Sequence, residues 1–191
     1  MQVDANNEDE LEEIEDNKKD CLDDAKKFYV LGSEDCPVSE TDTDVYYQNI
    51  YRIQKIENLD RCTNLKMLSL RKNLLTKIEG LDSCTELVEL DLYDNRIKKI
   101  EGLDALSKLE VLDLSFNRIK DVENLEPLTS LKKLYLISNR IRKIQNLGCL
   151  KTVEIVDFGD NKLKSIDGIE DVPHVLEFYA AKNRIKAISP C

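Results

Sequence analysis

Acidic and tyrosine side chains recur at multiples of 22 residues along this chain of 191 residues. Aspartate attracts lysine or arginine on a partner, and tyrosine is a frequent anchor in protein interfaces. Two further aromatic residues, Tyr93 and Phe116, lie close to this series in the sequence. The chemistry predicted from these residues is the binding of another protein. The candidate binding residues are Asp91, Tyr93, Asp113, Phe116, Tyr135, Asp157 and Tyr179.

The sequence offers no set of residues for catalysis or for a cofactor. The one histidine, His174, follows Pro173 in an expected turn, so the repeats assemble no histidine-based triad or dyad. None of the six cysteines has the C-x-x-C spacing of a zinc site, and no phosphate-binding glycine loop is present. We therefore expect no enzyme activity, no cofactor, no metal ion and no small-molecule substrate.

The elements that must position the binding residues come from a pattern repeated every 22 residues. It reads L-x-x-L-x-L-x-x-N-x-I/L-x-x-I-x-x-L from Leu65 almost to the last residue, which is the leucine-rich repeat signature. The alternating L-x-L predicts a short strand, and the asparagine that ends it is expected to bond backbone groups of its own turn and of neighbouring coils. The asparagines form a ladder of Asn73, Asn95, Asn117, Asn139, Asn161 and Asn183.

The remainder of each unit predicts the way back to the next strand. Its closer apolar spacing favours a short helical or 3-10 return, and a glycine or asparagine that tolerates positive φ precedes the next apolar residue. The expected fold is an α/β solenoid: a leucine-rich-repeat horseshoe with a parallel β-sheet on the concave face and short helical or 3-10 returns on the convex face. The Asp and Tyr series then faces the hollow. The positive-φ positions are Asn58, Gly80, Gly102, Asn124, Asn146 and Gly168.

Three segments follow from composition and register. Residues 1–42 are expected to be an acidic, mostly disordered N-terminal tail, because residues 1–44 carry 16 acidic and 4 basic side chains and few apolar ones. Residues 43–64 form a divergent N-terminal capping repeat with Tyr51 at the ladder position. Residues 65–191 are leucine-rich repeats, five full and one incomplete, with no C-terminal cap.

The missing cap leads to a further expectation. The apolar flank of the last repeat, with Phe178, Ile185 and Ile188, is expected to be uncovered or covered by something else. A truncated form of a longer solenoid would show this feature.

Charge and cysteine usage restrict partners and compartment. The net charge of −10 belongs almost wholly to the tail, and like charge disfavours nucleic acid or an anionic membrane as a partner. No apolar run approaches the roughly 18 residues that span a bilayer. The polar start of the sequence does not fit a signal peptide, and Cys62 and Cys84 occupy core positions of the repeat. We expect reduced thiols and a location in the nucleus, the cytoplasm or both.

The run Leu90-Asp91-Leu92-Tyr93-Asp94-Asn95-Arg96-Ile97-Lys98-Lys99-Ile100-Glu101 resembles the protein phosphatase 1 regulatory subunit 7 family, whose members consist of 22-residue leucine-rich repeats. The resemblance covers about residues 43–188, and the acidic N-terminal segment also fits. It implies a curved solenoid whose concave face holds the catalytic subunit of protein phosphatase 1 away from its active site. Such a protein is a regulator or assembly factor and not an enzyme.

The resemblance also implies contact residues. Four positions carry over by alignment, namely Asp113, Tyr135, Asp157 and Tyr179. Tyr135 and Tyr179 stand where phenylalanine is expected, and Asp157 stands where glutamate is expected. The family continues through several more repeats and a cap, with a further contact from a tryptophan. This chain contains no tryptophan and ends earlier, so about half of that interface is expected here.

Other functions stay open. Proteins of ciliary and centrosomal type share the bare 22-residue repeat, so an intracellular leucine-rich-repeat adaptor with another protein partner is the main alternative. An enzyme that uses the repeats to hold its substrate is disfavoured, because about 44 residues outside the repeats leave no room for a catalytic domain. A non-functional or dominant-negative short form would explain the uncovered last coil.

Overall fold

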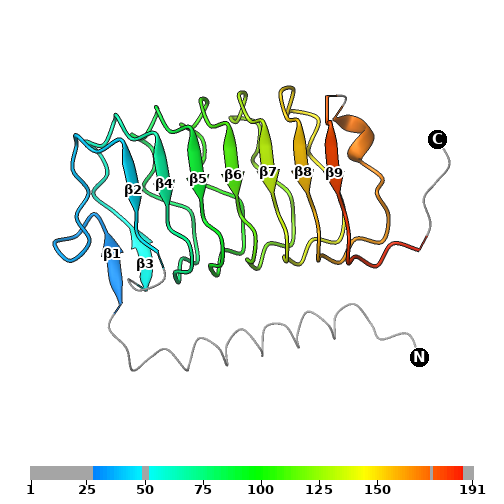
Figure 1. Cartoon of the computed structure of the whole chain (residues 1–191), viewed down its shortest axis with the longest axis horizontal. Helices are drawn as coiled ribbons and strands as arrows, with labels where there is room; N and C mark the ends of the chain where they lie inside the picture. The colour runs from blue at the N-terminus through cyan, green and yellow to red at the C-terminus, as the bar shows by residue number, and fades with distance from the viewer. Residues whose placement is uncertain (1–27, 49–51, 173, 187–191) are drawn as a thin grey trace.

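The chain winds into a parallel solenoid. The structure is a computed structural model, and it describes residues 28–48, 52–172 and 174–186. Its main sheet has seven parallel strands in the order β2-β4-β5-β6-β7-β8-β9 (Figure 1). The strands are β2 (Asp44–Tyr46), β4 (Met67–Ser69), β5 (Glu89–Asp91), β6 (Val111–Asp113), β7 (Lys133–Tyr135), β8 (Ile155–Asp157) and β9 (Glu177–Tyr179).

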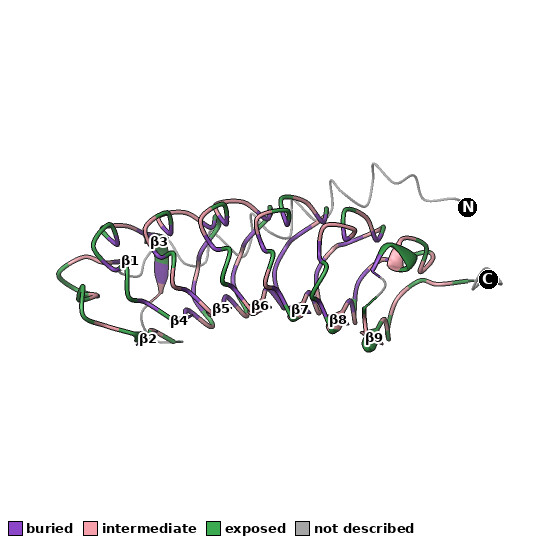
Figure 2. Ribbon diagram, turned by 90° about the horizontal axis from the view of Figure 1, so that it is seen from above, coloured by how far each residue is buried: buried purple, intermediate pink, exposed green. Residues whose placement is uncertain are grey.

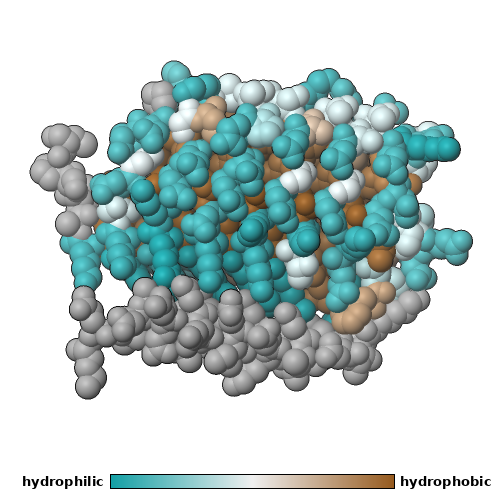
Figure 3. Space-filling model, turned by 180° about the vertical axis from the view of Figure 1, so that it is seen from behind, coloured by the Kyte–Doolittle hydropathy of each residue, from teal (hydrophilic) through white to brown (hydrophobic). Residues whose placement is uncertain are grey.

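The sheet lies on the inner side of a shallow arc. Seen from above, the strands follow the concave side and the return segments form the outer side (Figure 2). The outer face carries mainly hydrophilic side chains, with apolar core atoms visible between the coils (Figure 3). The expected concave parallel sheet is therefore confirmed.

The core consists of the repeated apolar positions, stacked coil upon coil. In the third coil Leu109, Leu112, Leu114, Ile119 and Val122 are all completely buried. Burying one such side chain stabilises the folded state by about 1.5–3 kcal/mol. Each strand has only three residues, so no coil closes a core by itself and the stability comes from stacking.

The asparagine ladder is confirmed in its details. The Asn117 amide nitrogen donates to the carbonyl oxygens of Leu92 in the preceding coil (3.0 Å) and of Leu114 in its own coil (3.0 Å). Its oxygen accepts a hydrogen bond from the backbone N–H of Ile97 (3.0 Å). The same pattern recurs at the other ladder positions, so each asparagine joins two coils at the end of a strand.

The expected helical returns are largely absent from the described residues. The only helical segment there is one 3-10 turn, η1 (Ile169–Asp171). In the other coils, isolated turns replace a helix: the N–H of Leu106 bonds to the carbonyl oxygen of Leu103 (3.0 Å), and that of Leu109 to Leu106 (3.0 Å). The buried residues come every third position here, which suits single turns, and the return is too short to continue them into a helix.

The turn that begins each return has the predicted conformation. All six glycine and asparagine positions expected to tolerate positive φ have it. At Gly102 φ is +68°, and an added Cβ would lie 2.3 Å from the carbonyl oxygen of Ile78 in the preceding coil. Asn124 takes the same conformation with a side chain that donates to the carbonyl oxygen of Ile100 (2.7 Å). The return therefore packs directly against the backbone of the coil before it.

The N-terminal boundary of the folded part was placed too late. Residues 28–42, which the sequence assigned to the disordered tail, contain β1 (Tyr29–Leu31), paired in parallel with β3 (Ile53–Ile56). Leu31 and Cys36 are completely buried. This half coil covers the apolar side of the first complete coil, a need that composition alone did not reveal. Residues 1–27 lie outside the described structure, and so does Tyr51.

At the other end the packing is looser. Both flanking residues of β9 are exposed, Phe178 and Ile185 are half-buried, and the Leu176 side chain is 77% exposed. Ile188 lies outside the described residues. Cys62 and Cys84 are buried free thiols, as expected for core positions. Within the described ranges, no helix has the length and apolar character needed to cross a membrane.

Candidate protein-binding face

Pairing in register assembles the predicted series into one line along the concave face. Asp91 lies opposite Asp113, Asp113 opposite Tyr135, and the later members follow in the same way. Adjacent strands are about 4.8 Å apart, so the side chains form a continuous stripe. We call it the central stripe, and its members are Ser69, Asp91, Asp113, Tyr135, Asp157 and Tyr179.

The stripe is one strand longer than the sequence indicated. Tyr46 of β2 pairs with Ser69 and is 55% exposed. The 22-residue count placed Tyr47 at this position, because the spacing between these two strands is 23 residues. The alternation in Asp44-Val45-Tyr46, with only Val45 buried, was the available signal.

The aspartates of the stripe serve their own strands first. The carboxylate of Asp91 accepts the backbone N–H of Tyr93 (3.1 Å), two residues further on. Asp113 accepts the N–H of Ser115 in the same way (2.9 Å). Asp157 repeats the bond with the N–H of Gly159 (2.7 Å). An aspartate at this position therefore has a structural function that does not depend on any partner, and sequence reasoning missed it.

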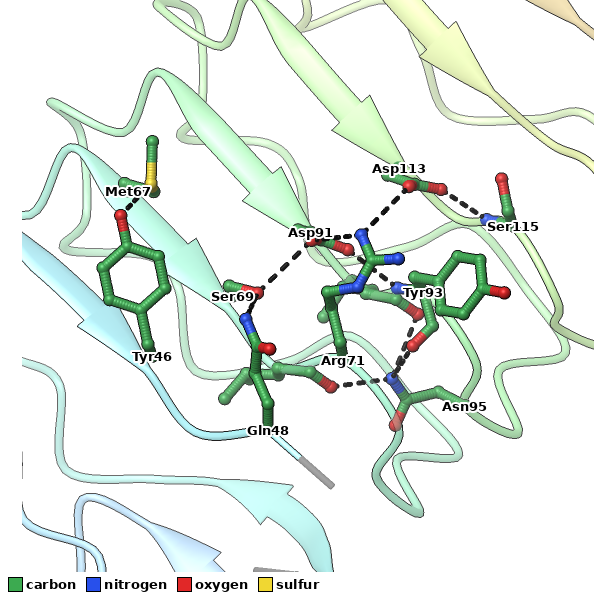
Figure 4. A network of polar contacts seen from close by, with 12 residues as sticks. Tyr46, Gln48, Met67, Ser69, Arg71, Asp91, Tyr93, Asn95, Asp113 and Ser115 are labelled. Atoms are coloured by element: carbon green, nitrogen blue, oxygen red, sulfur yellow. Dashed lines mark hydrogen bonds and ion pairs between the residues drawn. The ribbon is translucent and has the colours of Figure 1, made fainter. Parts of the chain in front are cut away.

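An internal cation neutralises the first two aspartates. Arg71 extends from the seventh position of the first full repeat to Asp91, with a nitrogen–oxygen distance of 2.9 Å (Figure 4). The corresponding distance to Asp113 is 3.9 Å. Asp91 also accepts a hydrogen bond from the Ser69 hydroxyl (3.3 Å), which in turn accepts one from the Gln48 amide. The network joins β4, β5 and β6 across the face.

The pKa shifts reflect this network. Burial alone would lower the pKa of Arg71, but the hydrogen bond to Asp91 and the charges of Asp91 and Asp113 raise it above its ordinary value. Burial raises the pKa of Asp113, although the bonds to Ser115 and the charge of Arg71 act in the opposite direction. Arg71 is thus a permanent cation held between two carboxylates.

This arrangement changes the expected role of two candidates. Asp91 and Asp113 were expected to attract lysine or arginine on a partner, but the charge of Arg71 already occupies that role. Asp91 is also only 9% exposed. Arg71 and Asp91 come from adjacent columns of neighbouring coils, so aligning the columns by register could have revealed the pair.

Tyr93 and Phe116 form an aromatic pair beside this network. Their ring centroids lie 4.8 Å apart, and the Arg71 guanidinium carbon is 4.1 Å from the Tyr93 ring centroid. Tyr93 is half-buried, whereas Phe116 is 44% exposed in the turn after β6. The pair provides a cation–π and ring–ring contact that holds Arg71 in place, with the Phe116 ring open to a partner.

The part of the face over β7–β9 differs in character. Tyr135 and Asp157 are half-buried, and Tyr179 is 49% exposed with its hydroxyl bonded to Glu177 (2.6 Å). In the described part of the chain, Asp157 has no ion pair. Two apolar residues that face the same side, Ile137 and Ile155, are half-buried and were not among the candidates. We call this set the anchor patch: Tyr135, Ile137, Ile155, Asp157 and Tyr179.

The patch combines aromatic, aliphatic and acidic side chains without internal neutralisation. Apolar and aromatic groups that lose contact with water supply most binding free energy at interfaces, and a single carboxylate adds orientation. Across the described ranges, no three His, Cys, Asp or Glu side chains gather as metal ligands. The arrangement suits docking of a protein surface.

Comparisons with known proteins agree with the solenoid. Residues 63–105, 85–127 and 107–149 each match the family model described as leucine rich repeats (2 copies). No curated protein matches the chain. These similarities do not test the narrower resemblance to phosphatase regulatory subunits.

Among solved structures, the chain is similar to two internalins of Listeria monocytogenes. InlF is 27% identical with a TM-score of 0.62, and the match covers 78% of this chain and 45% of InlF. Internalin C2 is 28% identical with a TM-score of 0.61, covering 73% and 62%. A leucine-rich-repeat protein of Leptospira interrogans is 22% identical with a TM-score of 0.66, covering 76% and 38%, which shows the fold alone. The chain therefore spans about half the length of these proteins.

Proposed function

We propose that this leucine-rich-repeat chain is a non-catalytic binding subunit whose concave face docks the catalytic subunit of protein phosphatase 1, in the nucleus or cytoplasm. The repeat fold is that of a protein-interaction scaffold. The identity of the partner rests on the resemblance described above.

One observation carries the proposal. The four positions to which the resemblance assigns contacts are Asp113, Tyr135, Asp157 and Tyr179, and they lie side by side on β6–β9. None of the four is buried, so all have surface to offer a partner. The two tyrosines sit in the anchor patch, where aromatic side chains contribute most to affinity.

The anchor patch defines the expected chemistry of docking. Tyr135 and Tyr179 flank Asp157, so a partner with one lysine or arginine between apolar groups would match all three side chains. Asp113 contributes less, because Arg71 already lies within 3.9 Å of its carboxylate. We expect the tyrosines to account for most of the affinity and Asp157 for most of its salt dependence.

The test is a binding titration with purified phosphatase catalytic subunit. The substitutions Tyr135→Ala and Tyr179→Ala together should weaken the affinity at least 100-fold, because each removes an interface anchor. Asp157→Asn keeps the oxygen that accepts the Gly159 N–H but loses the charge, and should weaken binding about fivefold at low salt. Thermal unfolding of each variant monitors the fold.

A matched control places the same chemical change elsewhere. Asp82→Asn and Asp104→Asn alter exposed turns away from the concave sheet and should leave the affinity unchanged. Equal binding by the wild type and the double tyrosine variant would refute the assigned face. If the folded wild-type chain does not bind the phosphatase and affinity purification recovers ciliary or centrosomal proteins, the adaptor hypothesis replaces the phosphatase.

A further inference from the structure

A groove with basic walls runs along the edge of the solenoid where the strands end. The residue after each ladder asparagine is basic in five successive coils, and the position two residues later is basic in the same five coils. These positions lie next to the ladder, so they repeat at the spacing of the strands, about 4.8 Å. The two columns are Arg96, Arg118, Arg140, Lys162 and Arg184, and Lys98, Lys120, Arg142, Lys164 and Lys186.

The groove is continuous over the first coils. Its first part is lined by Phe28, Leu74 and Arg96, among other residues. Leu74 and Arg96 also line the second part, which shares Arg118 and Arg140 with the third. Together these parts are lined by eight basic side chains and four acidic ones. The basic set is Lys55, Lys77, Arg96, Lys98, Lys99, Arg118, Lys120 and Arg140, and the acidic set is Glu79, Asp94, Asp121 and Glu123.

Arg118 lies at the centre of the groove and is only 7% exposed. A guanidinium with so little contact with water is suited to carboxylate ligands, which it binds through two parallel hydrogen bonds. The groove is therefore built for an acidic segment of polypeptide.

The described chain begins at the mouth of this groove. Phe28 lines its first part, and the guanidinium carbon of Arg52 is 5.2 Å from the Phe28 ring centroid. The sequence just before this point, residues 8–24, contains ten acidic and two basic side chains. Like the two basic columns, this segment carries ten charges of one sign.

Length permits the contact. From Leu74 to Arg184 the groove edge crosses five coil spacings, which is about 24 Å at the strand spacing. Seventeen residues span about 26 Å as a helix and up to about 56 Å when extended. The acidic segment thus reaches along the whole edge without strain.

We propose that residues 8–24 bind in this groove of the same molecule, so that the acidic tail is an intramolecular ligand of the basic edge. The tail then shields the edge from other acidic segments. Because the groove lies at the strand ends and not on the concave face, this contact is independent of phosphatase binding.

The first test is zero-length carbodiimide cross-linking of the full chain at low salt, followed by mass spectrometry. Carboxylates of residues 8–24 should couple to Lys98, Lys120 and Lys164 within one molecule. Coupling to Lys66, Lys108 and Lys132 at equal frequency would overturn the proposal. So would cross-links that join isotopically labelled and unlabelled copies, because the ligand would then come from another molecule.

The second test compares two full-length variants with four carboxylates neutralised in each. The tail variant carries Glu12→Gln, Glu13→Gln, Glu15→Gln and Asp16→Asn. The matched control carries Asp60→Asn, Asp82→Asn, Asp104→Asn and Glu126→Gln, all at exposed turns away from the groove. The probe is a fluorescent synthetic peptide of residues 8–24.

A short tether gives the tail an effective concentration of about 1 mM. For a peptide that binds the open groove at about 100 μM, the wild-type tail weakens apparent binding about tenfold. The tail variant should therefore bind the peptide about tenfold more tightly than the wild type and the control, with a loss of binding at high salt. Equal binding by all three proteins would overturn the proposal. So would a single-stranded RNA that binds the tail variant and that the peptide cannot displace.

Discussion

The asparagine ladder makes a quantitative prediction for a central coil. Asn117→Ala leaves the buried N–H of Ile97 without its acceptor and removes the donor to the carbonyl oxygens of Leu92 and Leu114. Each buried backbone group left unsatisfied costs about 1–3 kcal/mol, so we expect a loss of about 3–6 kcal/mol in the free energy of unfolding. A typical domain has about 5–15 kcal/mol in total, so the variant should be near its stability limit.

The last ladder position provides the matched control. Asn183 makes the same contacts but is half-buried, so water can replace the lost hydrogen bonds after Asn183→Ala. We expect this variant to lose about 1 kcal/mol. The assay is equilibrium unfolding in urea, with hydrogen exchange at the Ile97 amide as a local readout. Equal losses for the two variants, or an unchanged exchange rate at Ile97, would refute the assigned role of the ladder.

Three other predictions concern the turn, the acidic network and the thiols. Gly102→Ala should destabilise the fold by about 3 kcal/mol or more, because it combines a positive φ with a Cβ 2.3 Å from the Ile78 carbonyl oxygen. Gly148→Ala, whose Cβ would meet nothing closer than 3.8 Å, should be nearly neutral in the same thermal melt. Burial raises the pKa of Asp113 above its ordinary 3.8, so the folded chain binds this proton more tightly than the unfolded chain. The contribution of Asp113 to stability therefore falls as pH rises from 3.8 through the raised value, and Asp113→Asn should remove this fall from unfolding curves measured between pH 3 and 7. Burial raises the pKa of Cys84 to about 11, so at pH 8 about one thiol in a thousand is ionised. Alkylation of the native protein, followed by mass spectrometry, should modify the half-exposed Cys149 well before Cys84, and the reverse order would contradict the packing.

The regular part of this fold was predictable because one residue type performs one task in every coil. The ladder asparagines and the turn positions such as Gly102 and Asn124 repeat at a fixed spacing, and their backbone contacts repeat with them. The pairing of the central stripe follows from the same spacing. Periodicity therefore determined the concave sheet and the residues that face it.

The irregular parts were not predictable from periodicity. The step from Tyr46 to Ser69 contains one extra residue, so the stripe shifted by one position at the first strand. The half coil with Leu31 and Cys36 has no repeat signature, although it covers the core. The residue before each ladder asparagine also adopts positive φ, even at Phe116, because the N–H there bonds to the next coil and the position carries no glycine to mark it.

The candidate site was predictable in position and less so in chemistry. Alternation within each strand placed the seven candidate residues on one face or at its edge. The pairing of Arg71 with Asp91 and the bonds from each aspartate to a backbone N–H depend on distances between coils, which a column of letters does not contain.

The most direct test of the concave-face account is site-specific photo-cross-linking to the phosphatase catalytic subunit. A photoreactive phenylalanine analogue replaces Tyr179, which is 49% exposed in the anchor patch, or Asp104 in an exposed turn away from the sheet. The account predicts a covalent adduct from position 179 and none from position 104. An adduct from position 104, with none from position 179, would place the partner on another surface and contradict the account.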